Sequence, residues 1–156
     1  MTDFKPALLC TLMTLAIGAQ AQTIGEVDTT FKLIGANHKI VVEAFDDPKI
    51  AGVTCYVSSA KTGGVSGLIG LAEDTSDASI ACRQVGPIAS NVPIGLNEEV
   101  FNQRRSVLFK RLRVVRMVDA QRKVLLYLSY SDKLIEGSPK NSLTAVALNG
   151  ARIALK

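Results

Sequence analysis

The sequence predicts a mainly β domain of the α+β class, an antiparallel sheet or β-sandwich-like arrangement with about one short helix and one disulfide. Three observations support this prediction. Segments rich in β-branched residues recur along the chain, turn-forming residues separate them at hairpin distance, and two cysteines are available for an internal cross-link.

The first strand pair is predicted between residues 27 and 45. Val27–Ile34 and Lys39–Phe45 are β-rich, and Gly35–His38 between them are typical of a hairpin turn. Asp46–Pro48 predict a second turn. Val53–Ser58 then alternates in the manner of a strand.

A glycine-rich loop and the predicted helix follow this strand. Lys61–Gly70 contains four glycines, which suit positive backbone angles or a close approach to another group. Leu68–Asp77 is compatible with a short helix, with Thr75 or Asp74 as its cap.

The strongest β pattern lies in the C-terminal third. Ser106–Val118 and Val124–Tyr130 are joined by a short polar connection, which predicts a hairpin. The second of these strands is apolar on both faces, so we expect it to lie centrally in its sheet. In the first, Lys110 and Arg116 interrupt the apolar face and predict a bulge or strong twist.

Two further segments complete the strand assignment. A helix over Phe101–Val115 competes with the first strand of this hairpin, but the crowding of β-branched residues favours a strand. Leu143–Leu148 is predicted to be the last strand.

The N-terminus has the three regions of a cleavable signal peptide. Lys5 precedes an uncharged apolar segment over residues 7–17, and Ala19-Gln20-Ala21 matches the signal peptidase pattern. The apolar segment is too short to span a bilayer. The alternative, a buried N-terminal helix, leaves the Ala-Gln-Ala ending unexplained. We therefore expect residues 1–21 to be removed and residues 22–156 to form one exported domain without a transmembrane segment.

Two cysteines remain after this cleavage, because Cys10 lies in the signal peptide. Cys55 and Cys82 are predicted to form a structural disulfide in an oxidising compartment, closing a loop worth roughly 3–4 kcal/mol of chain entropy. A redox pair favours Cys-x-x-Cys, and a zinc site requires four ligands where only His38 could join the cysteines.

Catalytic motifs are weak in this chain. Ser58-Ser59-Ala60-Lys61 and Lys61-Thr62-Gly63 match fragments of the penicillin-recognising serine enzymes but share one lysine, although those motifs lie on opposite walls of a cleft. His38 is the single histidine and falls in a predicted turn. We predict no catalytic residue, metal or cofactor, and the sequence leans away from an enzyme.

Two polar regions remain as candidate sites. Carboxylates near residue 75 could form a polar cleft with the segment from residue 131 to 141, although an acidic helix start explains the former more simply. The candidate cleft residues are Glu73, Asp74, Asp77, Ser131, Asp132 and Lys133.

The other region is a strongly basic hairpin between Arg104 and Lys123. Its exposed face could attract an anionic envelope component, and the simpler interpretation is a solvated, edge-protecting face. The candidate anion-binding residues are Arg104, Arg105, Arg111 and Arg113. Nucleic acid is not an expected partner, because Phe109 is the sole aromatic residue among these charges.

Several segments together resemble the CreA family, the catabolite-regulation protein A proteins of Gram-negative bacteria. The matching segments are Gly25–Lys32, His38–Pro48, Val53–Ser58, Lys61–Gly64, Gly70–Asp77, Tyr130–Lys133 and Glu136–Asn141. The resemblance covers essentially the whole mature chain, and the connection over residues 90–101 and the tail after Val146 depart from it. It implies a periplasmic location and brings no catalytic residue, because the family has no established enzymatic activity.

These observations lead to two functional hypotheses. The first is a non-enzymatic periplasmic module that binds an envelope component or a partner protein. The alternative is a small cell-envelope hydrolase that uses carboxylates of residues 73–77 with the 131–141 segment. A pocket joining those two segments favours the hydrolase, whereas a flat basic face favours the binding module.

Overall fold

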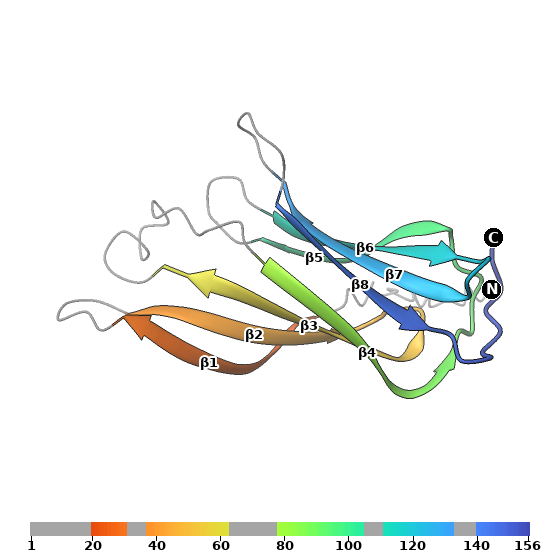
Figure 1. The fold of residues 1–156 in the computed structure, drawn as a ribbon, viewed down its shortest axis with the longest axis horizontal. Helices are drawn as coiled ribbons and strands as arrows, with labels where there is room; N and C mark the ends of the chain where they lie inside the picture. Colours follow the sequence, from red (N-terminus) through yellow and green to blue (C-terminus); the bar gives the residue numbers. More distant parts are fainter. Residues whose placement is uncertain (1–19, 31–36, 63–77, 105–110, 133–139) are drawn as a thin grey trace, which may run out of the picture.

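The computed structural model describes residues 20–30, 37–62, 78–104, 111–132 and 140–156. These residues form eight strands in two four-stranded sheets, ordered β1-β2-β3-β4 and β5-β6-β7-β8, and all neighbouring strands are antiparallel (Figure 1). The strands are β1 (Gln22–Thr30), β2 (His38–Asp46), β3 (Ala51–Lys61), β4 (Ala78–Ala89), β5 (Asn97–Arg104), β6 (Arg111–Asp119), β7 (Val124–Ser131) and β8 (Asn141–Ala147).

The predicted mainly β class with antiparallel sheets is therefore confirmed. The predicted short helix is not confirmed, because residues 68–77 lie outside the described residues and no helix occurs within the described part. The competing helix over residues 101–115 is wrong where the chain is described, since β5 and β6 occupy that region.

Strand alternation organises the first sheet. Val53, Cys55 and Val57 of β3 all point into the core, as the sequence predicts, and β2 pairs with β3 without a register shift. β1 forms the outer edge of this sheet, and all nine of its residues are exposed. The sheet therefore buries one face of β2, β3 and β4 and leaves β1 as a solvated border.

The second sheet contains the predicted C-terminal hairpin. β6 and β7 pair from Leu112–Ser131 to Asp119–Val124 without a register shift, so no bulge interrupts this pairing at Arg116, and the predicted alternative of a strong twist stays a prediction. The irregularity lies on the neighbouring strand β5, between Glu99 and Phe101. Arg116 keeps the regular inward position of its strand because its charge is paired in the interior.

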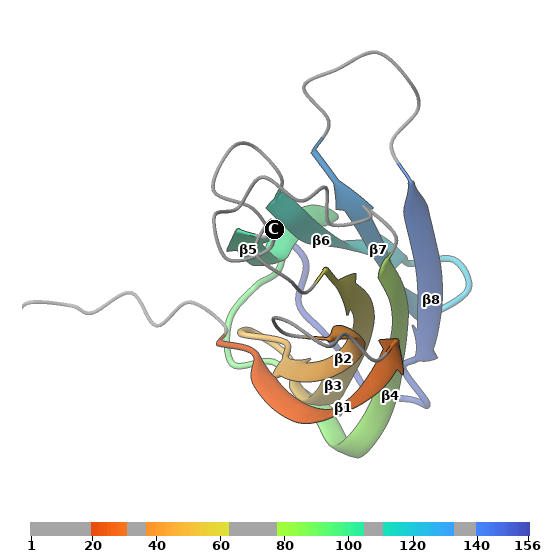
Figure 2. The ribbon, with the colours of Figure 1, turned by 90° about the vertical axis from the view of Figure 1, so that its left-hand side faces the viewer.

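The two sheets enclose one hydrophobic core and meet along one side. Phe45 and Phe101 stack between the sheets with ring centroids 4.3 Å apart. Along the seam between β4 and β8, the Cys82 backbone N–H donates to the Thr144 hydroxyl at 3.3 Å. Figure 2 shows β4 and β8 side by side at this seam. The fold is thus a β-sandwich whose sheets are joined at one edge by side-chain hydrogen bonds.

The predicted disulfide between Cys55 and Cys82 is present. The two cysteines are direct cross-strand partners on β3 and β4, with Cα atoms 3.9 Å apart. Both are buried, so the bond ties the centre of the first sheet together inside the core.

The two ends of the sandwich are built differently. We use "terminal end" for residues 92–96, 118–123 and 148–156, which backbone hydrogen bonds hold together. Ile94 N–H donates to Ala154 at 2.9 Å, Val118 N–H to Leu96 at 3.0 Å, and Leu148 N–H to Lys123 at 3.0 Å. The opposite end is where β4 and β8 begin.

Candidate functional site

A pocket of about 440 Å³ opens at the end of the sandwich where β4 and β8 begin. We call it the serine pocket, because four of its lining residues are serines. Its lining residues are Ile40, Ser58, Ser59, Ala60, Ala78, Ser79, Lys140, Asn141 and Ser142. Its volume falls in the range of about 300–1,000 Å³ that is typical of small-molecule sites.

Strand pairing places these polar groups together. Ser58 and Ser79 are cross-strand partners on β3 and β4, and their hydroxyl oxygens lie 2.8 Å apart in a hydrogen bond. The Ile80 backbone N–H donates to the Ser142 hydroxyl at 3.4 Å, which holds the start of β8 against β4. Three strands far apart in sequence thus supply one wall rich in hydroxyl groups.

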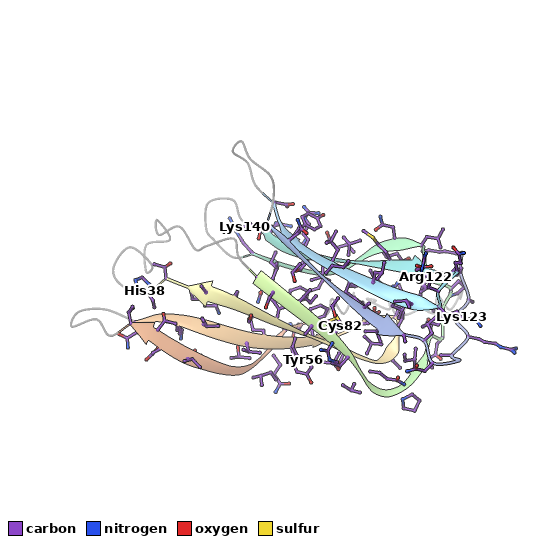
Figure 3. All side chains as sticks on the ribbon, in the orientation of Figure 1. His38, Tyr56, Cys82, Arg122, Lys123 and Lys140 are labelled. Atoms are coloured by element: carbon purple, nitrogen blue, oxygen red, sulfur yellow. A yellow bond between two sulfur atoms is a disulfide. The ribbon has the colours of Figure 1, made fainter. Side chains whose placement is uncertain are left out.

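Charge and apolar surface flank this wall. Lys140 contributes an ammonium group at the start of β8 (Figure 3), and Asn141 beside it contributes an amide. Ile40 and Ala60 are cross-strand partners on β2 and β3, so their side chains lie on the same face of the sheet. The lining therefore combines hydrogen-bonding groups, one cation and a small apolar surface.

The structure separates the described members of the predicted polar cleft. Ser131 is buried at the end of β7, whereas the Asp132 carboxylate accepts a hydrogen bond from Arg113 Nε at 2.8 Å. Glu73, Asp74, Asp77 and Lys133 lie outside the described residues. The serine pocket is nevertheless close in sequence to both predicted regions. Of its lining residues, 78–79 directly follow the predicted carboxylates of residues 73–77, and 140–141 belong to the 131–141 segment.

The described arginines of the predicted basic hairpin lie in different environments. Arg104 and Arg111 are exposed and lie opposite each other on β5 and β6, while Arg105 lies outside the described residues. Arg113 forms ion pairs with Asp132 and with Glu99, the latter at 2.9 Å. Hydrogen bonding and charge from Asp132, followed by the Glu99 carboxylate, raise the pKa of the Arg113 guanidinium. Part of the predicted positive face is thus neutralised by carboxylates of β5 and of the residue that follows β7.

Arg116, which the sequence counts with this basic face, lies in the core with 0% of its side chain exposed. Its Nη1 donates to both carboxylate oxygens of Asp47, at 2.6 and 2.7 Å, and its Nη2 donates to Glu98. The Tyr127 hydroxyl donates to the same Asp47 carboxylate at 2.9 Å. We call Asp47, Glu98, Arg116 and Tyr127, with Lys49 and Lys156, the ionic cluster.

The turn before β3 fixes the central carboxylate of this cluster. Asp47 Oδ1 accepts the backbone N–H groups of Lys49 and Ile50 at 2.9 and 3.0 Å, which closes the turn predicted over residues 46–48. Burial and the neighbouring Asp47 charge raise the pKa of the Tyr127 hydroxyl, so it remains a donor. Both carboxylate oxygens of Asp47 are therefore held by donors, which come from the turn before β3 and from β6 and β7 of the second sheet.

Glu98 links the ionic cluster to the terminal end. Lys49 Nζ and Lys156 Nζ each lie 2.9 Å from Glu98 Oε1. The hydrogen bond from Lys156, assisted by Lys49, lowers the pKa of Glu98 to about 2 despite its partial burial. The carboxylate stays ionised across the neutral range of pH and holds Lys156 through an ion pair.

Sequence reasoning missed the ionic cluster and the serine pocket. Alternation on β6 places Arg116 on the same face as Leu112 and Val114, and an arginine on a core face indicates a buried acidic partner. Asp47 lies 69 residues away in sequence, so no local pattern identifies it as that partner. The pocket depends on the register of β4 and β8, which the sequence does not show.

The described residues also bear on metal binding and on membrane-spanning helices. Among those residues, no group of three or more His, Cys, Asp or Glu side chains could hold a metal ion. The same residues include no helix long and apolar enough to cross a bilayer. His38 begins β2, where its carbonyl accepts the Thr29 hydroxyl at 3.1 Å.

Comparison with known proteins identifies the family. The model of the CreA protein family matches residues 24–151. Protein CreA of Escherichia coli strain K12 is 57% identical over 145 residues, covering 89% of this chain and 92% of that protein. Protein CreA of strains O6:H1 and O157:H7 gives the same identity and coverage. No solved structure matches the chain. The resemblance seen in the sequence is confirmed, and this chain belongs to the CreA family.

Proposed function

We propose that this chain is an exported periplasmic binding module and that the serine pocket is its ligand site. The observation that carries the proposal is one open pocket in which hydroxyl groups from β3, β4 and β8 converge. Hydroxyl groups both donate and accept hydrogen bonds, which suits reversible binding of a polar ligand. The Ala-Gln-Ala ending at Ala21 supports export and the predicted periplasmic location.

The lining favours a negatively charged, hydroxyl-rich small molecule. Lys140 supplies a cation for a carboxylate or phosphate, and Ser58, Ser79 and Asn141 supply groups that pair with sugar hydroxyls. Ile40 and Ala60 offer a surface for the apolar face of a sugar ring. Acidic or phosphorylated saccharides of the cell envelope have this chemistry.

Isothermal titration calorimetry with three probes tests the pocket. N-acetylmuramic acid offers a carboxylate, glucose 6-phosphate offers a phosphate, and N-acetylglucosamine is neutral. We expect a charged probe to bind more tightly than the neutral one. Replacing Lys140→Gln should weaken that binding about tenfold, because one charge-assisted contact is lost.

Lys123→Gln is the matched control, since it removes the same charge at the opposite end of the second sheet (Figure 3). We expect it to bind the charged probe like the parent protein. Equal weakening in both variants, or the absence of binding by all three probes, would contradict the serine pocket as the ligand site.

Export has its own measurement. Protein recovered from the periplasm should have an intact mass corresponding to residues 22–156, because signal peptidase is expected to cut after Ala21. A full-length mass, or recovery confined to the cytoplasm, would refute cleavage and export without affecting the ligand measurement.

A further inference from the structure

Three exposed apolar residues belong to the segments of the terminal end. Val92, Leu96 and Leu155 are 46%, 57% and 42% exposed. Ile94 and Leu155 are partners in a parallel bridge, and the Lys156 backbone N–H donates to Ile94 at 3.0 Å. The bridge therefore brings Leu155 next to the segment that carries Val92 and Leu96.

Cationic residues belong to the same end of the sandwich. Lys123, Arg152 and Lys156 are exposed, and backbone hydrogen bonds tie their segments to the terminal end. Lys156 and Lys49 share the Glu98 carboxylate, so these three side chains together carry one excess positive charge. Arg122 is paired with Asp119. The terminal end thus combines exposed aliphatic groups with a surplus of positive charge.

We propose that Val92, Leu96 and Leu155, with Lys123, Arg152 and Lys156, form a docking tip for the surface of an anionic phospholipid bilayer. Aliphatic side chains gain free energy when they leave water for the acyl boundary of a bilayer. Lysine and arginine beside them are attracted to negatively charged headgroups. The two contributions act on one tip because the same backbone bridges hold both sets of residues.

The composition of the tip favours a lipid surface over a protein partner. Energetically dominant positions in protein interfaces are enriched in Trp, Tyr and Arg, whereas the large apolar residues here are two leucines and a valine. Long cationic side chains around aliphatic groups are typical of proteins that bind in the membrane interface. The ionic cluster behind the tip holds Lys156 in place through Glu98.

Sedimentation with vesicles tests this proposal. The full mature chain is mixed with vesicles of phosphatidylglycerol and phosphatidylcholine, and with vesicles of phosphatidylcholine alone. We expect binding to the anionic vesicles that weakens as salt is raised to about 0.15 M, where the screening length is roughly 8 Å. Leu96→Ser should reduce binding about tenfold, and Lys123→Gln about fivefold.

Two matched controls lie at the pocket end. Leu143 is 58% exposed, so Leu143→Ser removes an equally exposed leucine outside the tip. Arg111→Gln removes one exposed positive charge at the start of β6, outside the lining of the serine pocket. Both should bind vesicles like the parent protein, and circular dichroism melting should confirm that all four variants are folded.

The outcomes separate the lipid surface from other partners. Loss of binding in the tip variants, with the pocket-end variants unchanged, supports the docking tip. Equal loss in Leu143→Ser, equal binding to neutral vesicles, or no sedimentation of the parent protein at low salt would overturn it. The last result would leave the tip as a protein contact.

Discussion

The two ends of this sandwich use polar residues in opposite ways. At the terminal end, the ionic cluster buries the Arg116 guanidinium and pairs its two terminal nitrogens with two carboxylates from different parts of the chain. At the pocket end, the Ser58 and Ser79 hydroxyls lie in exposed positions and bond to one another. Buried charges resist rearrangement because their separation is costly, whereas exposed hydroxyls exchange partners with little loss. We infer that one end fixes the fold and the other is available for ligands.

Two arginines on one strand show the same contrast. Arg113 and Arg116 lie on opposite faces of β6, so one is 33% exposed and the other is 0% exposed. Both form two ion pairs. Exposed pairs contribute little to stability because water competes for them, but a buried carboxylate that loses its partner is left without compensation.

The largest expected effect therefore follows from Arg116→Met. The substitution leaves Asp47 and Glu98 without their shared guanidinium and should cost about 3–5 kcal/mol of the free energy of unfolding. Urea denaturation monitored by circular dichroism measures this loss. Arg113→Met is the matched control and should change the midpoint only slightly. Similar midpoints for both variants would contradict the central role of the ionic cluster.

Reduction of the disulfide should have the next largest effect. The bond between Cys55 and Cys82 closes a loop with a sequence separation of 27 residues, worth about 3–4 kcal/mol in the chain-entropy account. The Cys55→Ala/Cys82→Ala double variant should lose a comparable amount. Thiol labelling should be absent in the unreduced parent protein. Free labelling of both cysteines before reduction would refute the bond.

The lowered pKa of Glu98 predicts a smaller, pH-dependent effect on the free energy of unfolding. Its pKa of about 2 in the folded state lies below the ordinary value of 4.5, because Lys156 and Lys49 favour its ionised form. Glu98 therefore stabilises the fold above about pH 4.5, and this contribution is lost as the pH falls toward about 2. Glu98→Gln should flatten the dependence of unfolding free energy on pH in this window.

Glu99→Gln provides the comparison for that experiment, because Glu99 is a neighbouring carboxylate with a more exposed side chain. It should leave the acid dependence close to that of the parent protein. An unchanged pH profile in Glu98→Gln would show that Glu98 does not fasten the terminal end.

Much of the fold could be predicted from the sequence. β2, β3, β6, β7 and β8 carry enough β-branched residues for the period-two pattern to be visible, and the cysteine pair was expected from the predicted export. β4 was missed because Gly86 and Pro87 interrupt it, and β5 because polar residues dominate it. These two strands form only because their partners supply hydrogen bonds and a core to pack against.

Less of the candidate site than of the fold could be predicted from the sequence. Ser58, Ser79 and Ser142 are ordinary polar residues in three separate segments, and only the pairing of β3 with β4 and the β4–β8 seam bring them together. Lys140 and Asn141 lie at the end of the 131–141 segment that the sequence singled out as polar, so that signal was correct in position for these two residues. Local patterns predict strands, whereas a pocket between strands depends on register.

The most direct test of the binding account is a backbone amide nuclear magnetic resonance titration of the mature protein with N-acetylmuramic acid and glucose 6-phosphate. We predict saturable shifts for amides of the serine pocket, above all Ser58, Ser79 and Ser142, with the terminal end unchanged. Shifts confined to residues 92–96 and 118–123, or no saturable shift at all, would contradict the claim that the pocket end binds the ligand.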